Sequence, residues 1–107
     1  MLIKEAWVVL LRSTAQERHY LISKHALQRM GERGIDEEDV EKCALLGNVL
    51  ESQDHGKDIK LLLQSMDSEG QDFYMIVALR YSDPSIIVTV CRFRKDVWGD
   101  QGSFRQR

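Results

Sequence analysis

The hydrophobic periodicity of the chain changes once, at Gly47, and this change constrains the fold most. Before Gly47 the apolar residues recur at helical spacing, and after it they alternate with polar residues at a spacing typical of strands. A run of helices followed by a run of strands is typical of α+β domains. The chain has 107 residues, of which 43% are hydrophobic, and this is enough for one modest core. We therefore expect a single α+β domain.

Signals for the start and end of a helix flank the segment after Ser23. Ser23 is a favourable N-cap residue, because its hydroxyl can accept a hydrogen bond from a free backbone N–H of the first turn. Gly34 occupies the position at which helices commonly end in a left-handed residue, and the next residue, Ile35, can contact Met30 as in a Schellman motif. The pattern predicts a helix from Ser23 through Arg33.

Two further helices are predicted on either side of this one. Asp36 is expected to cap a helix that runs to Leu46, with Gly47 in the same left-handed role as Gly34. The first twenty residues fit either a helix or a strand over Trp7–Leu11, and the spacing of their apolar residues favours the helix.

The second half of the chain predicts four strands, at Val49–Gln53, Ile59–Met66, Phe73–Tyr81 and Ile86–Arg94. Turns are expected around Gly70 and at 82–85, and such short connections indicate an antiparallel meander. The fold class we predict is α+β, with two or three N-terminal helices packed on one face of this four-stranded meander. The domain is expected to span 1–95, and 96–107 to form a flexible basic tail.

The loop lengths also predict which residues share a face of the sheet. They place Leu61 opposite Val77, and Val77 opposite Val90, so that one face is almost wholly apolar and faces the helices. The opposite face mixes cationic, hydroxyl and aromatic groups with apolar ones. Its expected members are Lys60, Leu62, Gln64, Tyr74, Ile76, Ala78, Arg80, Ile87, Thr89, Cys91 and Phe93.

Charge is unevenly distributed along this chain of net charge −2. The residues up to Arg33 are net basic, Asp36–Asp54 is strongly acidic, and the chain is basic again from Arg92. Such segregation allows a basic patch on an acidic protein, although dedicated nucleic-acid-binding domains are usually basic overall.

Neither a metal site nor a membrane segment is expected. Cys43 and Cys91 are far apart and belong to no cluster of cysteine and histidine, so both are expected to be reduced packing residues. The apolar run Ala6–Leu11 is too short for a membrane span and lacks a cleavage site. We therefore expect a cytoplasmic protein without membrane contact.

The stretch SKHALQRMGERGIDEEDV, residues 23–40, resembles a bacterial family of unknown function. The pattern of that family is Ser-x-His-Ala, then Arg-Met, Arg-Gly-Ile and an acidic helix start, followed by strands that end in a Thr-Val-Tyr-like segment. That last segment reads TVCRF here, at 89–93, and the resemblance spans 21–93. Its members resemble the RelE and MqsR messenger-RNA interferases of the barnase–EndoU–colicin–RelE-like group.

The resemblance implies RNA cleavage without a metal or cofactor. His25 matches the histidine of the motif and is expected to act as acid or base, and Arg29 matches the arginine that would clamp phosphate. On the sheet, Tyr74 and Arg80 are two further candidate catalytic residues. The candidate RNA contacts are Lys60, Arg33 and Arg92.

Members of that family are often encoded beside zinc-finger antitoxins. The resemblance therefore implies a toxin-like messenger-RNA interferase with RNA as substrate and a cognate antitoxin of zinc-finger or helix-turn-helix type as partner. The alternative is a non-catalytic protein-binding module that retains the fold. The acidic composition favours this alternative, as does Cys91, which stands where the family pattern has tyrosine.

Overall fold

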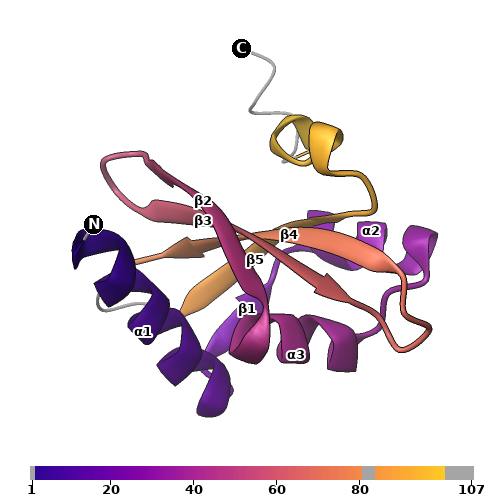
Figure 1. Cartoon of the computed structure of the whole chain (residues 1–107), viewed down its shortest axis with the longest axis horizontal. Coiled ribbons are helices and arrows are strands. Elements are labelled where there is room, and N and C mark those ends of the chain that lie inside the picture. Colours follow the sequence, from indigo (N-terminus) through magenta and orange to yellow (C-terminus); the bar gives the residue numbers. More distant parts are fainter. Residues whose placement is uncertain (1, 81–83, 101–107) are drawn as a thin grey trace.

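The computed structural model describes residues 2–80 and 84–100 and has an α+β fold. The described elements are, in chain order, α1 (Leu2–Gln16), β1 (Tyr20–Ile22), α2 (Lys24–Arg33), α3 (Glu37–Leu46), β2 (Asn48–Asp54), β3 (Ile59–Met66), β4 (Asp72–Leu79), β5 (Ser85–Cys91) and two short 3-10 helices, η1 (Arg94–Asp96) and η2 (Trp98–Asp100). The five strands form one mixed sheet in the order β1-β5-β4-β3-β2. Helices α1 and α3 lie on one side of the sheet, and the 3-10 helices lie on the other (Figure 1).

The prediction of four antiparallel strands was wrong in one respect. Strand β1 is a fifth strand, and it pairs in parallel with β5 through Tyr20↔Ser85, Leu21↔Ile86 and Ile22↔Ile87. Three residues are too few to establish a periodicity of two, so only the pairing itself reveals this strand. The other neighbouring pairs are antiparallel, as expected.

The helical half follows the predicted signals closely. The first segment is a helix, as favoured. The Ser23 side chain accepts from the backbone N–H of Ala26 at the start of α2, and at its end Gly34 is left-handed with φ 67°. The backbone N–H of Ile35 donates to the carbonyl of Met30 at 3.0 Å, which confirms the Schellman motif.

Helix α3 begins as predicted but ends differently. Asp36 caps it within a capping box that also uses Asp39. Gly47 is not left-handed: its φ is −65° and its ψ is 159°. A glycine is required for another reason, because a Cβ at this position would lie 2.6 Å from the carbonyl oxygen of Cys43 and 2.8 Å from its sulfur. Arg12 of α1 completes the helix end by donating to the carbonyls of Ala44 and Gly47 at 3.1 and 2.8 Å.

The sheet register confirms one predicted pairing and corrects the other. Leu61 lies opposite Val77, as expected. Between β4 and β5, however, Val90 lies opposite Met75 rather than Val77, and a β-bulge leaves Val88 without a partner in the register. The bulge exchanges the faces of neighbouring residues, so Ile87 packs in the core beneath the helices and not on the opposite face. The second predicted turn, at 82–85, falls largely on residues outside the described part of the chain.

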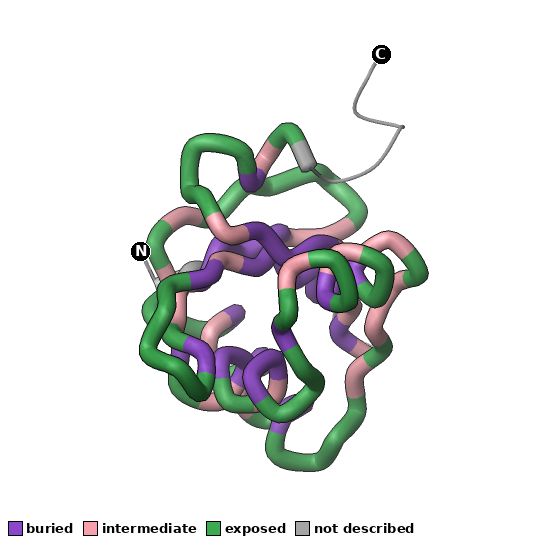
Figure 2. The backbone as a smooth tube through the Cα atoms, turned by 90° about the vertical axis from the view of Figure 1, so that its right-hand side faces the viewer, coloured by how far each residue is buried: buried purple, intermediate pink, exposed green. Residues whose placement is uncertain are grey.

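Two apolar clusters cover the two sides of the sheet. The larger lies between the sheet and the helices and includes Leu11, Val40, Phe73 and Val77. The smaller lies on the other side, which we call the open face, and contains Leu62, Ile76, Cys91 and Val97. Buried backbone runs through the middle of the molecule between these layers (Figure 2).

Residues 94–100, which include η1 and η2, fold back over the open face, and we call this segment the strap (Figure 1). Val97 is fully buried in the smaller cluster, with Trp98 packed against it. The predicted tail begins at residue 96, so its first five residues belong to the strap. The rest of that tail, 101–107, lies outside the described residues.

Candidate functional site

Helix α2 lies along the edge of β5, where it continues the line of β1. The backbone N–H of Ser23 donates to the carbonyl of Ile87 at 3.0 Å, and its hydroxyl donates to the carbonyl of Val88 at 2.9 Å. Ala26 and Met30 then point into the larger core. Because residues four apart share a face of a helix, His25, Arg29 and Arg33 form a separate row along α2.

His25 reaches the open face of the sheet. Its Nε2 lies 2.9 Å from the Oγ1 of Thr89, and the Thr89 side chain is fully buried. Thr89 pairs with Ile76 in the middle of the sheet. The bulge at Val88 is next to Thr89, so the local twist of β5 that it introduces lies where the histidine meets the strand.

The two arginines of the row are held by one carboxylate. Arg29 Nη1 lies 3.0 Å from Glu32 Oε1, and Arg33 Nη1 lies 3.5 Å from the same oxygen. The Glu32 side chain is 49% exposed, and exposed ion pairs of this kind contribute only about 0–1 kcal/mol to stability. Glu32 thus orients both guanidinium groups without anchoring them strongly.

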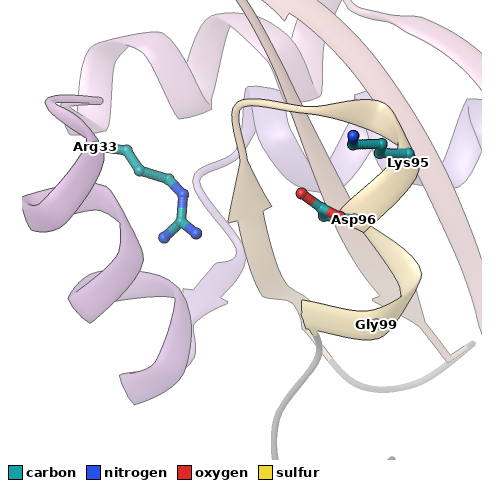
Figure 3. Close-up of a pocket in the computed structure, with 4 residues that line it drawn as sticks. All are labelled: Arg33, Lys95, Asp96 and Gly99. Atoms are coloured by element: carbon teal, nitrogen blue, oxygen red, sulfur yellow. The ribbon is translucent and has the colours of Figure 1, made fainter.

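A pocket of about 380 Å³ lies between the C-terminal end of α2 and the strap, lined by Arg33, Lys95, Asp96 and Gly99. The side chains of Arg33 and Asp96 point toward one another across this space, and Lys95 extends from the strap beside them (Figure 3). We call the surface that runs from His25 along Arg29 and Arg33 to this pocket the groove.

Arg92 forms several polar contacts at the C-terminal end of α2. Its guanidinium donates to the carbonyl oxygens of Arg33 at 2.8 Å and Asp72 at 3.2 Å, and it lies 2.8 Å from a carboxylate oxygen of Asp67. Backbone N–H donation by Gln71, together with this guanidinium, holds the pKa of Asp67 below its ordinary value. Arg92 therefore ties α2 to the β3–β4 turn, which gives it a structural role beside the predicted RNA contact.

A second pocket, of about 650 Å³, opens at the start of β4 and the end of β5, lined by Gln71, Asp72, Tyr74, Arg92, Phe93 and Arg94. Tyr74 pairs with Cys91, one step along the same face from the Ile76–Thr89 pair. Tyr74, for which the sequence predicts a catalytic role, thus lies near the contact between His25 and Thr89. Cys91 itself is buried beneath the strap and does not line this pocket.

The structure does not bring the other two sheet candidates to the groove. Lys60 pairs with Ala78 and Gln53, two strands away from β5, and its side chain is largely buried. Arg80 directly follows β4, about 20 Å along the strand from Tyr74 by the rise per residue. It lines a different pocket with Trp7 and the β2–β3 loop.

Glu51 of β2 anchors the strap. The indole Nε1 of Trp98 donates to one of its carboxylate oxygens at 2.7 Å, and Arg94 donates to the other at 2.8 Å. These two bonds, that of Trp98 foremost, lower the pKa of Glu51. The strap is therefore fastened at both ends, by β5 and by Glu51 on the far strand.

Sequence reasoning did not assign a role to several residues of the site. Thr89 was placed on the open face but not paired with His25, since a contact across 64 residues leaves no local pattern. Lys95 and Asp96 fell next to or within the expected tail. The one available signal was the mixed composition of the tail, in which the apolar Val97 and Trp98 interrupt polar residues.

Two kinds of feature are absent from the described part of the chain. No cluster of three or more His, Cys, Asp or Glu side chains there is arranged to hold a metal ion. No helix in the same part of the chain is long and apolar enough to cross a membrane.

Comparison with known proteins gives a match over most of the chain. Residues 22–92 match the model of a domain of unknown function, DUF4258. No curated protein and no solved structure matches the chain. The matched range contains the α2 row, the sheet from β2 to β5 and Arg92, and ends just before the strap.

Proposed function

The chain belongs to the DUF4258 family, whose function is unknown, and we propose that it is a metal-independent endoribonuclease that binds RNA in the groove. The observation that carries this proposal is the contact of His25 with Thr89. This contact places the imidazole on the open face, at one end of a row whose other members are the guanidinium groups of Arg29 and Arg33. A proton-transfer group beside two phosphate-binding groups is what cleavage of a phosphodiester requires.

The reaction we propose is transesterification within the RNA strand. The ribose 2′-oxygen forms a bond to the adjacent phosphorus, and the bond from phosphorus to the 5′-oxygen breaks. The products are a 2′,3′-cyclic phosphate and a 5′-hydroxyl. His25 takes the proton of the 2′-hydroxyl, and Tyr74, one pair along the sheet from the Thr89 contact, is the candidate donor to the departing 5′-oxygen.

Thr89 suits the histidine in both of its protonation states. The Thr89 hydroxyl can accept from Nε2–H both in the neutral ring that carries its proton on Nε2 and in the protonated ring, which leaves Nδ1 to take the proton of the 2′-hydroxyl. The ring orientation is therefore kept while the proton moves, and the buried Thr89 acts as a positioning residue for His25.

Arg29 and Arg33 supply the positive charge. A planar guanidinium can bind two phosphate oxygens at once, and it remains protonated at every relevant pH. The exposed Glu32 holds both groups, and an incoming phosphate can replace its carboxylate at small cost.

The resemblance to RelE- and MqsR-like messenger-RNA interferases supports a wider part of the proposal. On this view the protein is a toxin that cleaves messenger RNA in the cytoplasm, and it is inhibited by a cognate antitoxin of zinc-finger or helix-turn-helix type. The groove between α2 and the strap is the surface that such an antitoxin would have to cover.

The proposal is tested by incubating the purified chain with a labelled RNA in the presence of EDTA. We expect cleavage to products that end in a 2′,3′-cyclic phosphate, and no cleavage of the same strand with 2′-deoxyribose. His25→Ala should lower the rate by about 10²- to 10⁴-fold, the usual contribution of a general acid or base, and Arg29→Ala should lower it as well. Expression of the active protein should arrest growth.

Matched controls are available on the same chain. His55→Ala removes an exposed histidine of the β2–β3 loop that bonds only locally to Gln53, and Arg18→Ala removes an arginine whose side chain is 77% exposed. Both should cleave RNA like the unaltered chain. If the unaltered protein cleaves no RNA and its expression leaves growth unchanged, the enzyme proposal is wrong and the non-catalytic binding module becomes the better interpretation.

A further inference from the structure

Phe93 is a large aromatic side chain left on the surface. It is 66% exposed, although it lies two residues after the end of β5 and four residues before the buried Val97 of the strap. Exposed apolar residues are common singly, so exposure alone indicates nothing. Phe93, however, also lines the pocket of about 650 Å³ at the start of β4, together with the half-buried Tyr74.

The size and lining of this pocket fit one nucleotide. Sites for small ligands commonly have volumes of about 300–1,000 Å³, with apolar or aromatic walls and a few polar groups. Here the two aromatic rings are accompanied by the amide of Gln71, the carboxylate of Asp72 and the two arginines that flank Phe93. Amide and carboxylate groups can pair with the edge of a base while a ring stacks on its face.

The charges around the pocket are already paired. Arg92 lies 2.8 Å from Asp67, and Arg94 lies 2.8 Å from Glu51. Asp72 adds a negative charge to the lining. This environment offers little net attraction to a phosphate, so a ligand here would be held by stacking and base-edge hydrogen bonds.

We propose that this pocket is a base-stacking subsite for single-stranded RNA, in which the ring of Phe93 stacks on a nucleobase. The inference rests on the proposed function, and it adds a sequence-tolerant binding element to the groove. Aromatic side chains bind bases of any type, because every base has a π-face.

The subsite lies within reach of the proposed reaction centre. Tyr74 in its wall pairs with Cys91, two residues along β5 from Thr89, which is roughly 7 Å at the rise of a strand. Arg94 lines this pocket and the next residue, Lys95, lines the pocket facing Arg33. One RNA strand can therefore pass from the Phe93 subsite to the α2 row.

The test measures binding separately from cleavage. The probe is a fluorescein-labelled single-stranded oligonucleotide with 2′-O-methyl ribose, which cannot be cleaved because the attacking hydroxyl is blocked, and its affinity is read by fluorescence anisotropy. Phe93→Ala should raise the Kd about tenfold, as expected for the loss of one stacked base. Phe93→Trp, which keeps a stacking surface, should bind within about twofold of the unaltered protein.

Two controls separate stacking from other effects. Leu46→Ala truncates an apolar residue of α3 that is 73% exposed and remote from the open face, and it should leave the Kd unchanged. Arg33→Gln should reduce the slope of log Kd against log salt concentration by about one unit. Phe93→Ala should leave this slope unchanged, since it removes no charge.

The outcomes distinguish the two proposals. If Phe93→Ala binds the probe as tightly as the unaltered protein, the subsite is wrong, even if His25→Ala abolishes cleavage. If Phe93→Ala weakens binding but no RNA is cleaved, the subsite stands and the enzyme proposal falls. If the unaltered protein does not bind the probe, the subsite is overturned, and a protein partner becomes the better occupant of this pocket.

Discussion

Individual residues of the groove owe their roles to partners that lie far along the chain. His25 contacts Thr89, and Arg92 bridges the end of α2 and the β3–β4 turn. The contacts of His25 and of the Arg33 carbonyl join α2 to β5 and to the residue that follows it. The positions of these side chains therefore report on how α2 docks against β5.

The contact between His25 and Thr89 should be measurable as a coupling energy. Thr89→Val keeps the shape of the side chain but removes the hydroxyl, and we expect it to lower the free energy of unfolding by about 1–3 kcal/mol, because a buried polar partner is lost. In a His25→Ala background the same substitution should lower the free energy of unfolding by much less. Urea unfolding of the four proteins gives the double-mutant cycle. If Thr89→Val lowers the free energy of unfolding equally in the two backgrounds, the two side chains are not coupled.

At the scale of the element, α2 is defined by its own ends. Ser23 caps its start, and Gly34, with φ 67°, ends it within a Schellman motif. These signals are local in the sequence. Helix α3 differs, since its end depends on donation by Arg12 from another helix and on close contact between Gly47 and Cys43.

Two glycines of the α2 region should respond to alanine with opposite signs. Gly34→Ala places a Cβ on a left-handed residue, which should cost about 1–2 kcal/mol of unfolding free energy. Gly31→Ala falls inside the helix at an exposed position with nothing within 4 Å of the added Cβ, so it should stabilise by about 0.5–1 kcal/mol. Thermal or urea unfolding measures the change in stability of both variants. Destabilisation by Gly31→Ala would contradict an exposed, regular helical position for this residue.

At the scale of the whole molecule, the sheet separates two cores of unequal size. The helices cover one side, and the strap covers the apolar cluster on the other. Each cluster contains one buried cysteine, Cys43 beneath the helices and Cys91 beneath the strap. Burial raises the pKa of the Cys43 thiol to about 12, and a thiol with so high a pKa reacts slowly with alkylating reagents.

The two cysteines should therefore report separately on the two faces. Val97→Ala weakens the packing of the strap, so the strap should open locally more often. We expect iodoacetamide to modify Cys91 roughly tenfold or more faster in this variant, while the rate at Cys43 stays the same; mass spectrometry of peptides distinguishes the two. Leu46→Ala, an exposed truncation, should change neither rate. Equal acceleration at both cysteines would mean that the strap opens only when the whole domain unfolds.

The sequence by itself determined the features that depend on near neighbours. The change of period at Gly47, the caps at Ser23 and Asp36, the left-handed Gly34 and the β3–β4 register all follow from residues close together in the chain. The row of His25, Arg29 and Arg33 also follows, because helical spacing alone aligns it.

Only the tertiary structure decided what depends on long-range pairing. The short strand β1, the bulge at Val88 and the docking of the strap require partners many residues away, and hydrophobic spacing carries no signal for them. The docking of α2 against β5 left Lys60 and Arg80 away from the groove and brought His25 into contact with Thr89. Local patterns fix the elements of this protein, whereas the contacts across the sheet fix which side chains meet at its candidate site.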